Sequence, residues 1–522
     1  MTALLAFLPI LLILALMIGW RWSAAAAGSL AMAVAVAIAF AGFGYGTTVY
    51  PNLGASGAVA GALAEATFVA ATILWIIFPA LCIYELQKHG GALDTLRCAL
   101  AGLSDDPRIA AILVGWFFAL FMEGAAGFGT PVALVAPILV SLGFAPVQAL
   151  TLALIGHAVG VSFGAIGTPI FPQMAVTGYS GLQIGRWTAL LHASLGWILL
   201  MFLAAIASRG RLVAGPASSP ASQIWRWVCL AAPAFLIPYL LIASLVGPEL
   251  PTLLGALIGA AIFVLVLRWR GAADPHPSGV SAVQLVWAGL PYLVLLGLIL
   301  VTRLIPPLRE ALQSLVWQWS LFGTFSGSVQ PLYHPGTMLL IGFILGGVSQ
   351  GRSAPELWRA AGRASGRLLP VVVALIAMLA LSRVMVHAGM IAELADTVAS
   401  LTGAAWPLLV PAVGVLGSFV TGSATASNIL LTDFQEAAAR ALGLPVLQLV
   451  AGQGFGAAVG NIVCPHNVIA GAATVGLVGR EGEILRHTAF AALTYSAVGG
   501  VLLYGLIFLF PDAIEVTPSA ER

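Results

Sequence analysis

The chain has 522 residues, of which 60% are hydrophobic and only 8% are charged, and its formal net charge is +2. Its mean hydropathy is +1.04. This composition excludes a soluble globular protein and predicts one that crosses a membrane many times.

Apolar runs long enough to cross about 30 Å of hydrocarbon recur along the whole chain. We expect an all-α polytopic membrane protein with about twelve spans and two further segments, 109–143 and 405–441, that are broken near their middle. The first run is kept as a span, because no basic residue precedes it and no convincing signal-peptide cleavage site follows it. The predicted spans are 3–20, 23–42, 58–86, 147–166, 187–207, 226–246, 251–268, 282–302, 336–350, 369–386, 446–460 and 488–510.

Cysteine and histidine spacing argues against metal and disulfide chemistry. The four cysteines lie in or beside apolar segments without a CxxC spacing, which indicates packing thiols. The eight histidines contain no HExxH motif. We therefore expect no metal and no cofactor.

Basic residues fix the predicted orientation. They gather in four connections, which the positive-inside rule places in the cytoplasm. Segment 109–143 then enters and leaves from the cytoplasmic side, and segment 405–441 from the opposite side, with both termini outside. The two segments are predicted to be re-entrant hairpins of opposite sense. The clusters are Lys88, Arg97 and Arg108; Arg209 and Arg211; Arg268 and Arg270; and Arg352, Arg359, Arg363 and Arg367.

An internal repeat predicts the same geometry. The segment that begins at His89 aligns with the one that begins at His387, 298 residues later, and the Gly-rich breaks keep nearly this offset. Chance similarity in a background rich in glycine, alanine and leucine explains any single match, but several matches in one order favour an inverted repeat. Within one domain, 1–522, we predict repeats at 57–210 and 353–510, joined by connecting helices at 211–352.

The two breaks, Glu123 to Pro131 and Thr421 to Asn428, point to a transporter's binding site. Breaks at membrane depth are tolerated only where they line a cavity or are covered by protein. Helix N-termini there offer free N–H groups and positive potential to a small anion. The alternative is that the polar side chains merely cap broken helices, which is compatible with binding. The predicted substrate contacts are Gly124, Gly127, Gly129, Thr130, Thr421, Ser423, Thr425, Ser427, Asn428, His466 and Asn467.

Titratable residues near the breaks are candidates for proton coupling. Glu123 follows a long apolar run, where a carboxylate is costly in its charged form and therefore tends to hold a proton, as a proton carrier must. The alternative is an interfacial carboxylate that stays ionised. His157 lies in a further break, and histidine, whose unperturbed pKa is about 6.5, suits a proton relay or a structural donor role. Glu65 is a second buried candidate. Arg303 and Arg383 could attract an anion or extend to the interface.

Four motifs resemble those of the lactate permease family. They are EGAAGFGTPVAL (123–134), FGAIGTP (163–169), TGSATASN (421–428) and ATVGLVGREGE (473–483), and the similarity is collinear over nearly the whole chain. The resemblance implies a secondary transporter of the bacterial inner membrane that carries L-lactate, glycolate or a related 2-hydroxymonocarboxylate by proton symport. The family is also similar in plan to transporters whose paired hairpins work by an elevator motion.

Departures from the family pattern leave the substrate open. His157 and Ala158 stand where the family has Asn-Thr, Ala424 where it has an acid, Asn461 where it has Lys, and His466–Asn467 where it has Gln-Ser. Joint loss of an acid and a base is physically sensible, because either one left alone in the interior would be destabilising. Another small organic anion, or sodium as the coupling ion, stays an alternative. The oligomeric state is also open, and no nucleic acid is expected.

An intramembrane enzyme and a channel are the alternatives to transport. An intramembrane enzyme needs a convergent nucleophile and base, or a metal set, which the sequence does not offer. A channel with re-entrant loops is more often a short subunit repeated by oligomerisation. We therefore expect a transporter without enzymatic activity.

Overall fold

The computed structural model describes residues 2–509 except 17–19, 21, 102–103, 105, 128, 210–223, 271–279 and 478–479. Arg211 and parts of the predicted spans 3–20 and 488–510 lie outside these residues. Eleven segments of the described chain are long and apolar enough to cross a membrane, or twelve if the bent pair Ala354–Gly366 and Val371–His387 counts as one. The chain is therefore a mostly helical, multi-pass membrane protein.

The first half begins with two apolar helices and the long helix α3, and continues through a helix pair and a broken helix. The elements α5, η2 and α6 form the first arm of a helical hairpin and α7 forms its second arm; we call this hairpin 1. One turn of its first arm, η2, is π-helical. The elements are α1 (Thr2–Leu14), α2 (Ala24–Phe43), α3 (Gly54–His89), α4 (Ala92–Ala101), α5 (Pro107–Ile112), η2 (Leu113–Phe118), α6 (Ala119–Ala125), α7 (Thr130–Ser141), α8 (Pro146–His157), η3 (Ala158–Phe163), α9 (Gly164–Gly167), α10 (Ile170–Thr177) and α11 (Gly181–Ser208).

The middle of the chain contains four apolar helices, the short polar helix α15 and a β-hairpin. Strand β1 (Trp317–Leu321) pairs antiparallel with β2 (Phe325–Val329), and the loop between them places Phe322 and Gly323 at positive φ. The predicted spans 282–302 and 336–350 leave this connection without a predicted element. The helices are α12 (Ile224–Leu245), α13 (Pro251–Trp269), α14 (Ala282–Leu304), α15 (Pro306–Gln313) and α16 (Pro335–Ser349).

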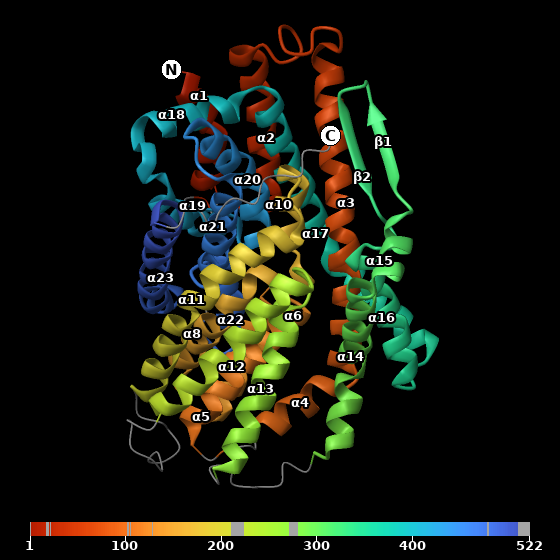
Figure 1. The fold of residues 1–522 in the computed structure, drawn as a ribbon, viewed down its shortest axis with the longest axis vertical. Coiled ribbons are helices and arrows are strands. Elements are labelled where there is room, and N and C mark those ends of the chain that lie inside the picture. The colour runs from red at the N-terminus through yellow and green to blue at the C-terminus, as the bar shows by residue number, and fades with distance from the viewer. Residues whose placement is uncertain are drawn as a thin grey trace.

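The second half repeats the element order of the first from α3 onward. The pair α19 and α20 is called hairpin 2. Figure 1 shows α4 near the lower end of the molecule and its counterpart α18 near the upper end, so the two halves place their short helices at opposite ends. The elements are α17 (Ala354–His387), α18 (Met390–Thr402), η5 (Gly403–Ala405), α19 (Trp406–Thr421), α20 (Ala424–Ala441), α21 (Val446–Gly460), α22 (Pro465–Thr474) and α23 (Glu481–Leu509).

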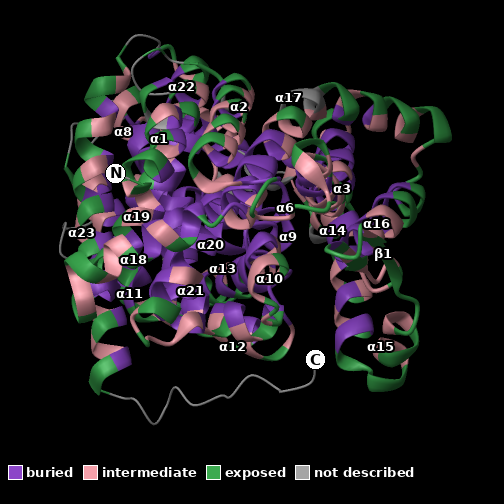
Figure 2. Cartoon of the chain, turned by 90° about the horizontal axis from the view of Figure 1, so that it is seen from above, coloured by how far each residue is buried: buried purple, intermediate pink, exposed green. Residues whose placement is uncertain are grey.

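The helices form two groups, which we call the frame and the hairpin body. In the frame, α17 packs against α3 and α2, and α16 packs against α3 and α14. In the hairpin body, α19 packs against α20, α21 and α23, and α12 packs against α11 and α13. Figure 2 shows α14 and α16 to one side and the buried hairpin body on the other.

Burial places the broken elements at the centre. The most apolar windows of Pro107–Ala125 and Pro146–Gly167 are 100% buried, whereas that of Pro251–Trp269 is 39% buried. Arms of this kind are surrounded by protein rather than lipid, and irregular backbone is tolerated only in such places. The breaks that they carry therefore lie in the protein interior.

Some helix bounds differ from the predicted spans. The predicted span 369–386 is the second part of α17, which begins at Ala354, inside the connection where the sequence analysis placed its fourth basic cluster. A capping box between Ser353 and Glu356 starts this helix. Helix α1 ends at Leu14, and α16 has only 15 residues.

Candidate functional site

The tip of hairpin 1 is shaped by glycines. Gly127 and Gly129 both have positive φ, which L residues rarely adopt, and they separate α6 from α7. The Thr130 hydroxyl donates to the carbonyl of Gly127 at 2.7 Å. Gly129 occupies the N-cap of α7 and supplies no side-chain cap. The N-terminus of α7, which is the positive end of its helix dipole, therefore has no side-chain cap.

Glu123 lies just before this tip and is only 4% exposed. Its Oε1 atom lies against the first broken helix, because a Cβ added at Gly164 would approach it to 2.1 Å. Among the described residues, no group hydrogen-bonds or ion-pairs with this carboxyl. A buried carboxyl without a partner is costly in its charged form. Glu123 is thus an uncompensated acid in the centre of the protein.

The tip of hairpin 2 carries a helix N-terminus without a side-chain cap. Gly422 ends α19 at φ 79°, and Ser423 starts α20 without a side-chain cap. The first helical hydrogen bond of α20 runs from the N–H of Ser427 to the carbonyl of Ser423. The three N–H groups before it therefore have no partner within the helix. Thr421 is occupied, because its hydroxyl donates to the carbonyl of Gly417 at 2.8 Å.

Two predicted contacts of hairpin 2 are engaged in packing. The Ser427 hydroxyl donates to the carbonyl of Gly414 at 3.1 Å and accepts from Gln453 at 3.2 Å. The Asn428 amide donates to the carbonyl of Pro169 at 2.9 Å. Both side chains are fully buried. They hold hairpin 2 to α21 and to the first broken helix.

The breaks of the two halves meet through His157. Its Nδ1 lies 2.8 Å from the carbonyl of Ala153, and its Nε2 lies 3.4 Å from Oδ1 of Asn461. The amide of Asn467 donates to the same Asn461 oxygen. A Cβ on Gly129 would lie 2.9 Å from Oδ1 of Asn467. Hairpin 1 and both breaks therefore converge on one polar cluster.

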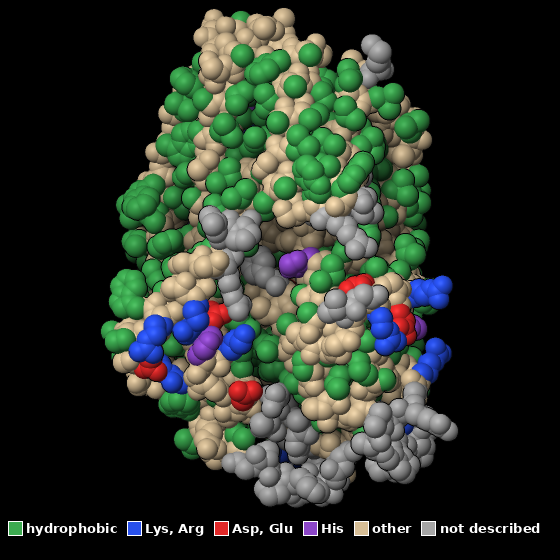
Figure 3. Space-filling model, turned by 180° about the vertical axis from the view of Figure 1, so that it is seen from behind, with side chains coloured by type: hydrophobic (Ala, Val, Ile, Leu, Met, Phe, Trp, Pro, Cys, Tyr) green, Lys and Arg blue, Asp and Glu red, His purple; other side chains and the backbone are tan. Residues whose placement is uncertain are grey.

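His466 lies beside the tip of hairpin 2 and is exposed. A Cβ on Gly422 would lie 3.4 Å from the His466 Cβ, so the imidazole stands next to the α20 N-terminus. Ser423 is half-buried, and Thr425 is 4% exposed. Figure 3 shows one face of the molecule hollowed near mid-height, with a histidine side chain in the wall.

A polar chain that the sequence analysis missed runs between the helices behind the breaks. Ser162 contacts Nε2 of His192 at 2.9 Å, and Nδ1 of His192 contacts the Tyr495 hydroxyl at 3.1 Å. In hairpin 2, Gln435 donates to Gln453 at 3.1 Å. The available signal was the presence of polar residues inside apolar helices.

Arg383 and Arg303 both bind carboxylates. Arg383 donates to both oxygens of Asp433, at 2.7 and 2.9 Å. Arg303 donates twice to Oε1 of Glu249, at 2.7 and 3.2 Å. Both guanidinium groups are therefore engaged by carboxylates of the chain.

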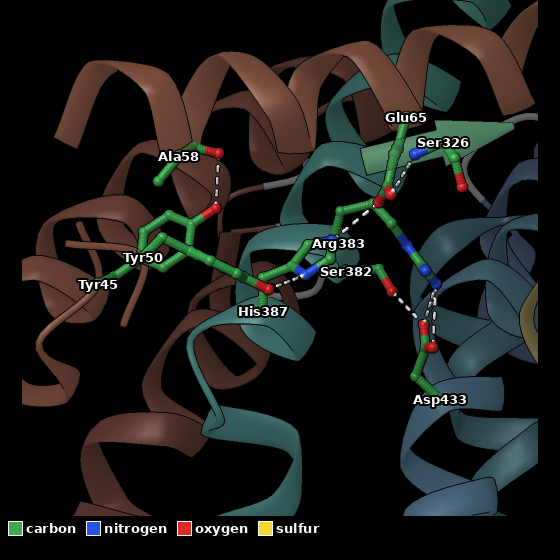
Figure 4. Close-up of polar contacts among 9 residues, drawn as sticks. All are labelled: Tyr45, Tyr50, Ala58, Glu65, Ser326, Ser382, Arg383, His387 and Asp433. Atoms are coloured by element: carbon green, nitrogen blue, oxygen red, sulfur yellow. Dashed lines mark hydrogen bonds and ion pairs between the residues drawn. The ribbon is translucent and has the colours of Figure 1, made fainter. Parts of the chain in front are cut away.

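Glu65 lies in the frame, away from the hairpin tips. Figure 4 shows its contacts: Oε2 lies 2.8 Å from Nε2 of His387, and the Ser326 N–H of strand β2 donates to Oε1 at 3.3 Å. The Tyr50 hydroxyl contacts Nδ1 of His387 at 3.0 Å. Glu65 and His387 therefore form one polar cluster, closed by the β-hairpin.

No group of three or more histidine, cysteine or acidic side chains suited to a metal ion occurs in the described part of the chain. Cys82 and Cys464 are buried, and Cys229 is exposed. The polar groups at the two tips are backbone N–H groups, hydroxyls, amides and one imidazole. Such a set binds a small anion by hydrogen bonds and the helix dipole.

Comparison with protein families gives one match along most of the chain. The family model described as L-lactate permease matches residues 2–510. An L-lactate permease of Streptococcus iniae is 30% identical over 379 residues, which cover 71% of this chain and 78% of that protein. An L-lactate permease of Escherichia coli strain K12 is 29% identical and covers 84% and 86%. The glycolate permease GlcA of the same strain is 28% identical and covers 84% and 85%.

Solved structures were also compared. A structure of Neisseria gonorrhoeae MtrF has a TM-score of 0.44 and 14% identity, over 83% of this chain and 81% of that one. The Alcanivorax borkumensis YdaH transporter has a TM-score of 0.47 and 15% identity, over 85% and 87%.

Proposed function

Since the chain belongs to the L-lactate permease family, we propose that it carries L-lactate or a related small 2-hydroxymonocarboxylate, such as glycolate, by proton symport across the bacterial inner membrane. Family membership and the eleven apolar segments make it a multi-pass permease of the membrane. The substrate, the coupling ion and the motion are the parts that the proposal adds.

One observation carries the choice of substrate. The N-terminus of α20 has no side-chain cap and stands beside the exposed His466 at the tip of hairpin 2. Three free N–H groups suit a single carboxylate. Ser423 and His466 offer hydrogen-bonding groups for the neighbouring 2-hydroxyl, and Thr425 lies in the first turn. The glycines of hairpin 1, with Asn467 beside Gly129, complete the proposed contacts.

Glu123 is the proposed proton carrier. The carboxyl is buried and has no partner in the described part of the chain, so it is costly to move while charged and less costly when neutral. A proton bound to Glu123 during movement with substrate, and released afterwards, couples the two fluxes. His157 joins the breaks of both halves and is the second proposed proton group.

The movement that we propose is of the elevator type. The two halves, at 57–210 and 353–510, have the same order of elements, and their short helices lie at opposite ends. We propose that they form an inverted repeat whose hairpins, within 109–143 and 405–441, are re-entrant and of opposite sense. The hairpin body then moves against the frame and carries the tips with it.

Uptake into proteoliposomes tests this function. Purified protein is reconstituted, and radiolabelled L-lactate, glycolate and a dicarboxylate are offered with a proton or a sodium gradient imposed separately. We expect accumulation of the monocarboxylates when the vesicle interior is alkaline. Absence of monocarboxylate accumulation under either gradient contradicts the proposal, and accumulation that follows only sodium replaces the proton as coupling ion.

A second candidate is a permease for another small organic anion. The tip of hairpin 2 carries Ala424 in place of an acid and has His466 beside it, which changes the charge and hydrogen bonding offered to a ligand. Competition of unlabelled organic anions with lactate uptake decides between the two. A dicarboxylate that competes better than lactate favours this candidate.

A further inference from the structure

Two arginine–carboxylate pairs connect the frame to the hairpin body. Arg383 on α17 binds Asp433 on α20, and Arg303 on α14 binds Glu249 in the connection between α12 and α13. In both pairs the arginine belongs to the frame and the carboxylate to the body. The carboxylates are buried, at 9% and 4% exposure.

The first pair holds the second arm of hairpin 2. Arg383 contacts both carboxylate oxygens, and the neighbouring Ser382 hydroxyl donates to Oδ2 of Asp433 at 2.6 Å. Figure 4 shows these groups facing one another between the two helices. Asp433 lies nine residues along α20 from Ala424, or about 14 Å. It is too far from the tip to touch a ligand there, so any effect on binding passes through the position of α20.

The second pair holds the support of hairpin 1. The Arg303 guanidinium also lies 3.7 Å from the centre of the Tyr333 ring and donates to the Tyr333 carbonyl at 3.1 Å. The connection that carries Glu249 packs on the first half, because a Cβ at Gly167 would approach the Pro248 carbonyl to 2.5 Å. A Cβ at Gly124 would approach the Leu253 backbone to 2.5 Å.

Charge pairs and apolar contacts respond differently to sliding. Apolar side chains exchange neighbours with little loss, whereas a buried charge that leaves its partner must find water or a new partner. Each arginine makes two hydrogen bonds to its carboxylate, which restricts the angle of approach. Such a contact is either made or broken, which suits a boundary between two positions of a moving body.

On the basis of the proposed function, we propose that the pairs Arg383–Asp433 and Arg303–Glu249 are positioning contacts that lock the hairpin body against the frame in the observed conformation. Both pairs open when the body moves. They belong to the transport cycle although none of the four side chains lies at the hairpin tips.

A reversible cross-link tests the first lock. Arg383→Cys and Asp433→Cys are introduced together, so that no lone buried charge remains, in a chain whose Cys98 and Cys229 are serine. A short bis-thiosulfonate bridges the two thiols, and a reductant removes it. We expect uptake to fall at least about tenfold when the bridge forms and to return on reduction, since a joined pair cannot separate.

The matched control joins two positions of one helix. Glu436 and Arg440 form an exposed ion pair within α20, so a bridge between Glu436→Cys and Arg440→Cys leaves the frame and the body independent. This variant should transport equally with and without the bridge. Full uptake by the bridged 383–433 variant overturns the proposal.

A distance measurement separates failure of the lock from failure of the proposed function. Spin labels replace the exposed Trp358 on α17 and Arg440 on α20, and pulsed electron resonance records their distance with and without the joint substitution Arg383→Gln and Asp433→Asn. We expect a second distance population when the lock is removed. An unchanged distribution overturns the lock, whether or not lactate is transported; absence of uptake by the parent protein contradicts only the proposed function.

Discussion

The two hairpins occupy corresponding places in the two halves but differ in chemistry. Hairpin 1 carries a buried acid, Glu123, and a tip made of glycine. Hairpin 2 has Ala424 near its tip, with hydroxyl groups, an uncapped helix N-terminus and an exposed histidine beside it. In the proposed function, hairpin 1 therefore supplies the proton site and hairpin 2 supplies donors to the anion. The proposed repeat thus divides coupling and binding between its two halves.

The hairpins are also built differently. The first arm of hairpin 1 contains the π-helical turn Leu113–Phe118, whereas α19 is a regular helix. Helix α19 meets α21 backbone to backbone, since a Cβ at Gly456 would lie 2.0 Å from the Pro411 carbonyl. Hairpin 2 and α21 are therefore closely packed.

The largest expected effect separates coupling from binding. Glu123→Gln keeps the shape of the side chain but removes its proton exchange, so gradient-driven lactate uptake should fall to the level of protein-free vesicles while lactate–lactate exchange continues. Both are measured in proteoliposomes, with Glu436→Gln as the control. Concentrative uptake that survives in Glu123→Gln removes the coupling role and the contrast between the hairpins.

The next effect tests how tightly hairpin 2 packs against α21. Gly456→Ala places a methyl group against the Pro411 carbonyl, and overpacking of this kind costs about 1–3 kcal/mol. The apparent Tm of the purified protein should fall. Gly362→Ala is the matched control, because no atom lies within 4 Å of its added Cβ and alanine favours a helix. Equal Tm values for the two variants would show that the α19–α21 contact accommodates the added methyl group without loss of stability.

A third comparison lies within hairpin 2. Ser423→Ala removes a half-buried hydroxyl at the α20 N-terminus, and loss of one hydrogen bond to a charged ligand costs about 1.5 kcal/mol. The KM for lactate should rise about tenfold at unchanged Tm. Ser427→Ala should instead lower the Tm and leave the KM unchanged, because this hydroxyl is hydrogen-bonded to Gly414 and Gln453. The same KM change in both variants would contradict the separation of binding and packing residues.

The smallest effect should be shared by both hairpins. Thr130 and Thr421 each donate a hydroxyl to a backbone carbonyl, at 2.7 and 2.8 Å. Substitution of either by alanine should cost about 1 kcal/mol of stability, measured as a modest fall in Tm. A rise in KM for Thr421→Ala but not for Thr130→Ala would indicate that Thr421 contacts the ligand and that the two tips differ in this respect.

Composition and motif were sufficient for the class of fold and for the family. The apolar excess predicted the membrane helices, which the structure has, and the motifs around Glu123 and Thr421 indicated the L-lactate permease family, which the family comparison confirms. The assignment of binding contacts, proton groups and opposed re-entrant hairpins stays a prediction.

Other features could not be read from the sequence, because they depend on contacts between distant segments. Ser427 lies three residues from Ala424 on the same helix, and nothing local indicates that its hydroxyl contacts Gln453 of α21. Arg383 finds its partner 50 residues away. The start of α17 did carry a signal, the Ser353–Glu356 capping box, but the nearby arginines led to its assignment as a loop. The β-hairpin lies in a connection between two predicted spans, for which no element was predicted.

The π-helical turn of hairpin 1 has a consequence for how its relatives can diverge. A π-turn contains one residue more than an α-helical turn. Deletion of a single codon between Leu113 and Phe118 would therefore convert this turn to α-helix and leave the later positions of the arm facing nearly as before. The same deletion in an α-helical stretch of the arm would instead turn Glu123 away from Gly164 by about 100°. The π-helical turn is thus the place in this arm where a residue can be lost without changing the direction of the acid.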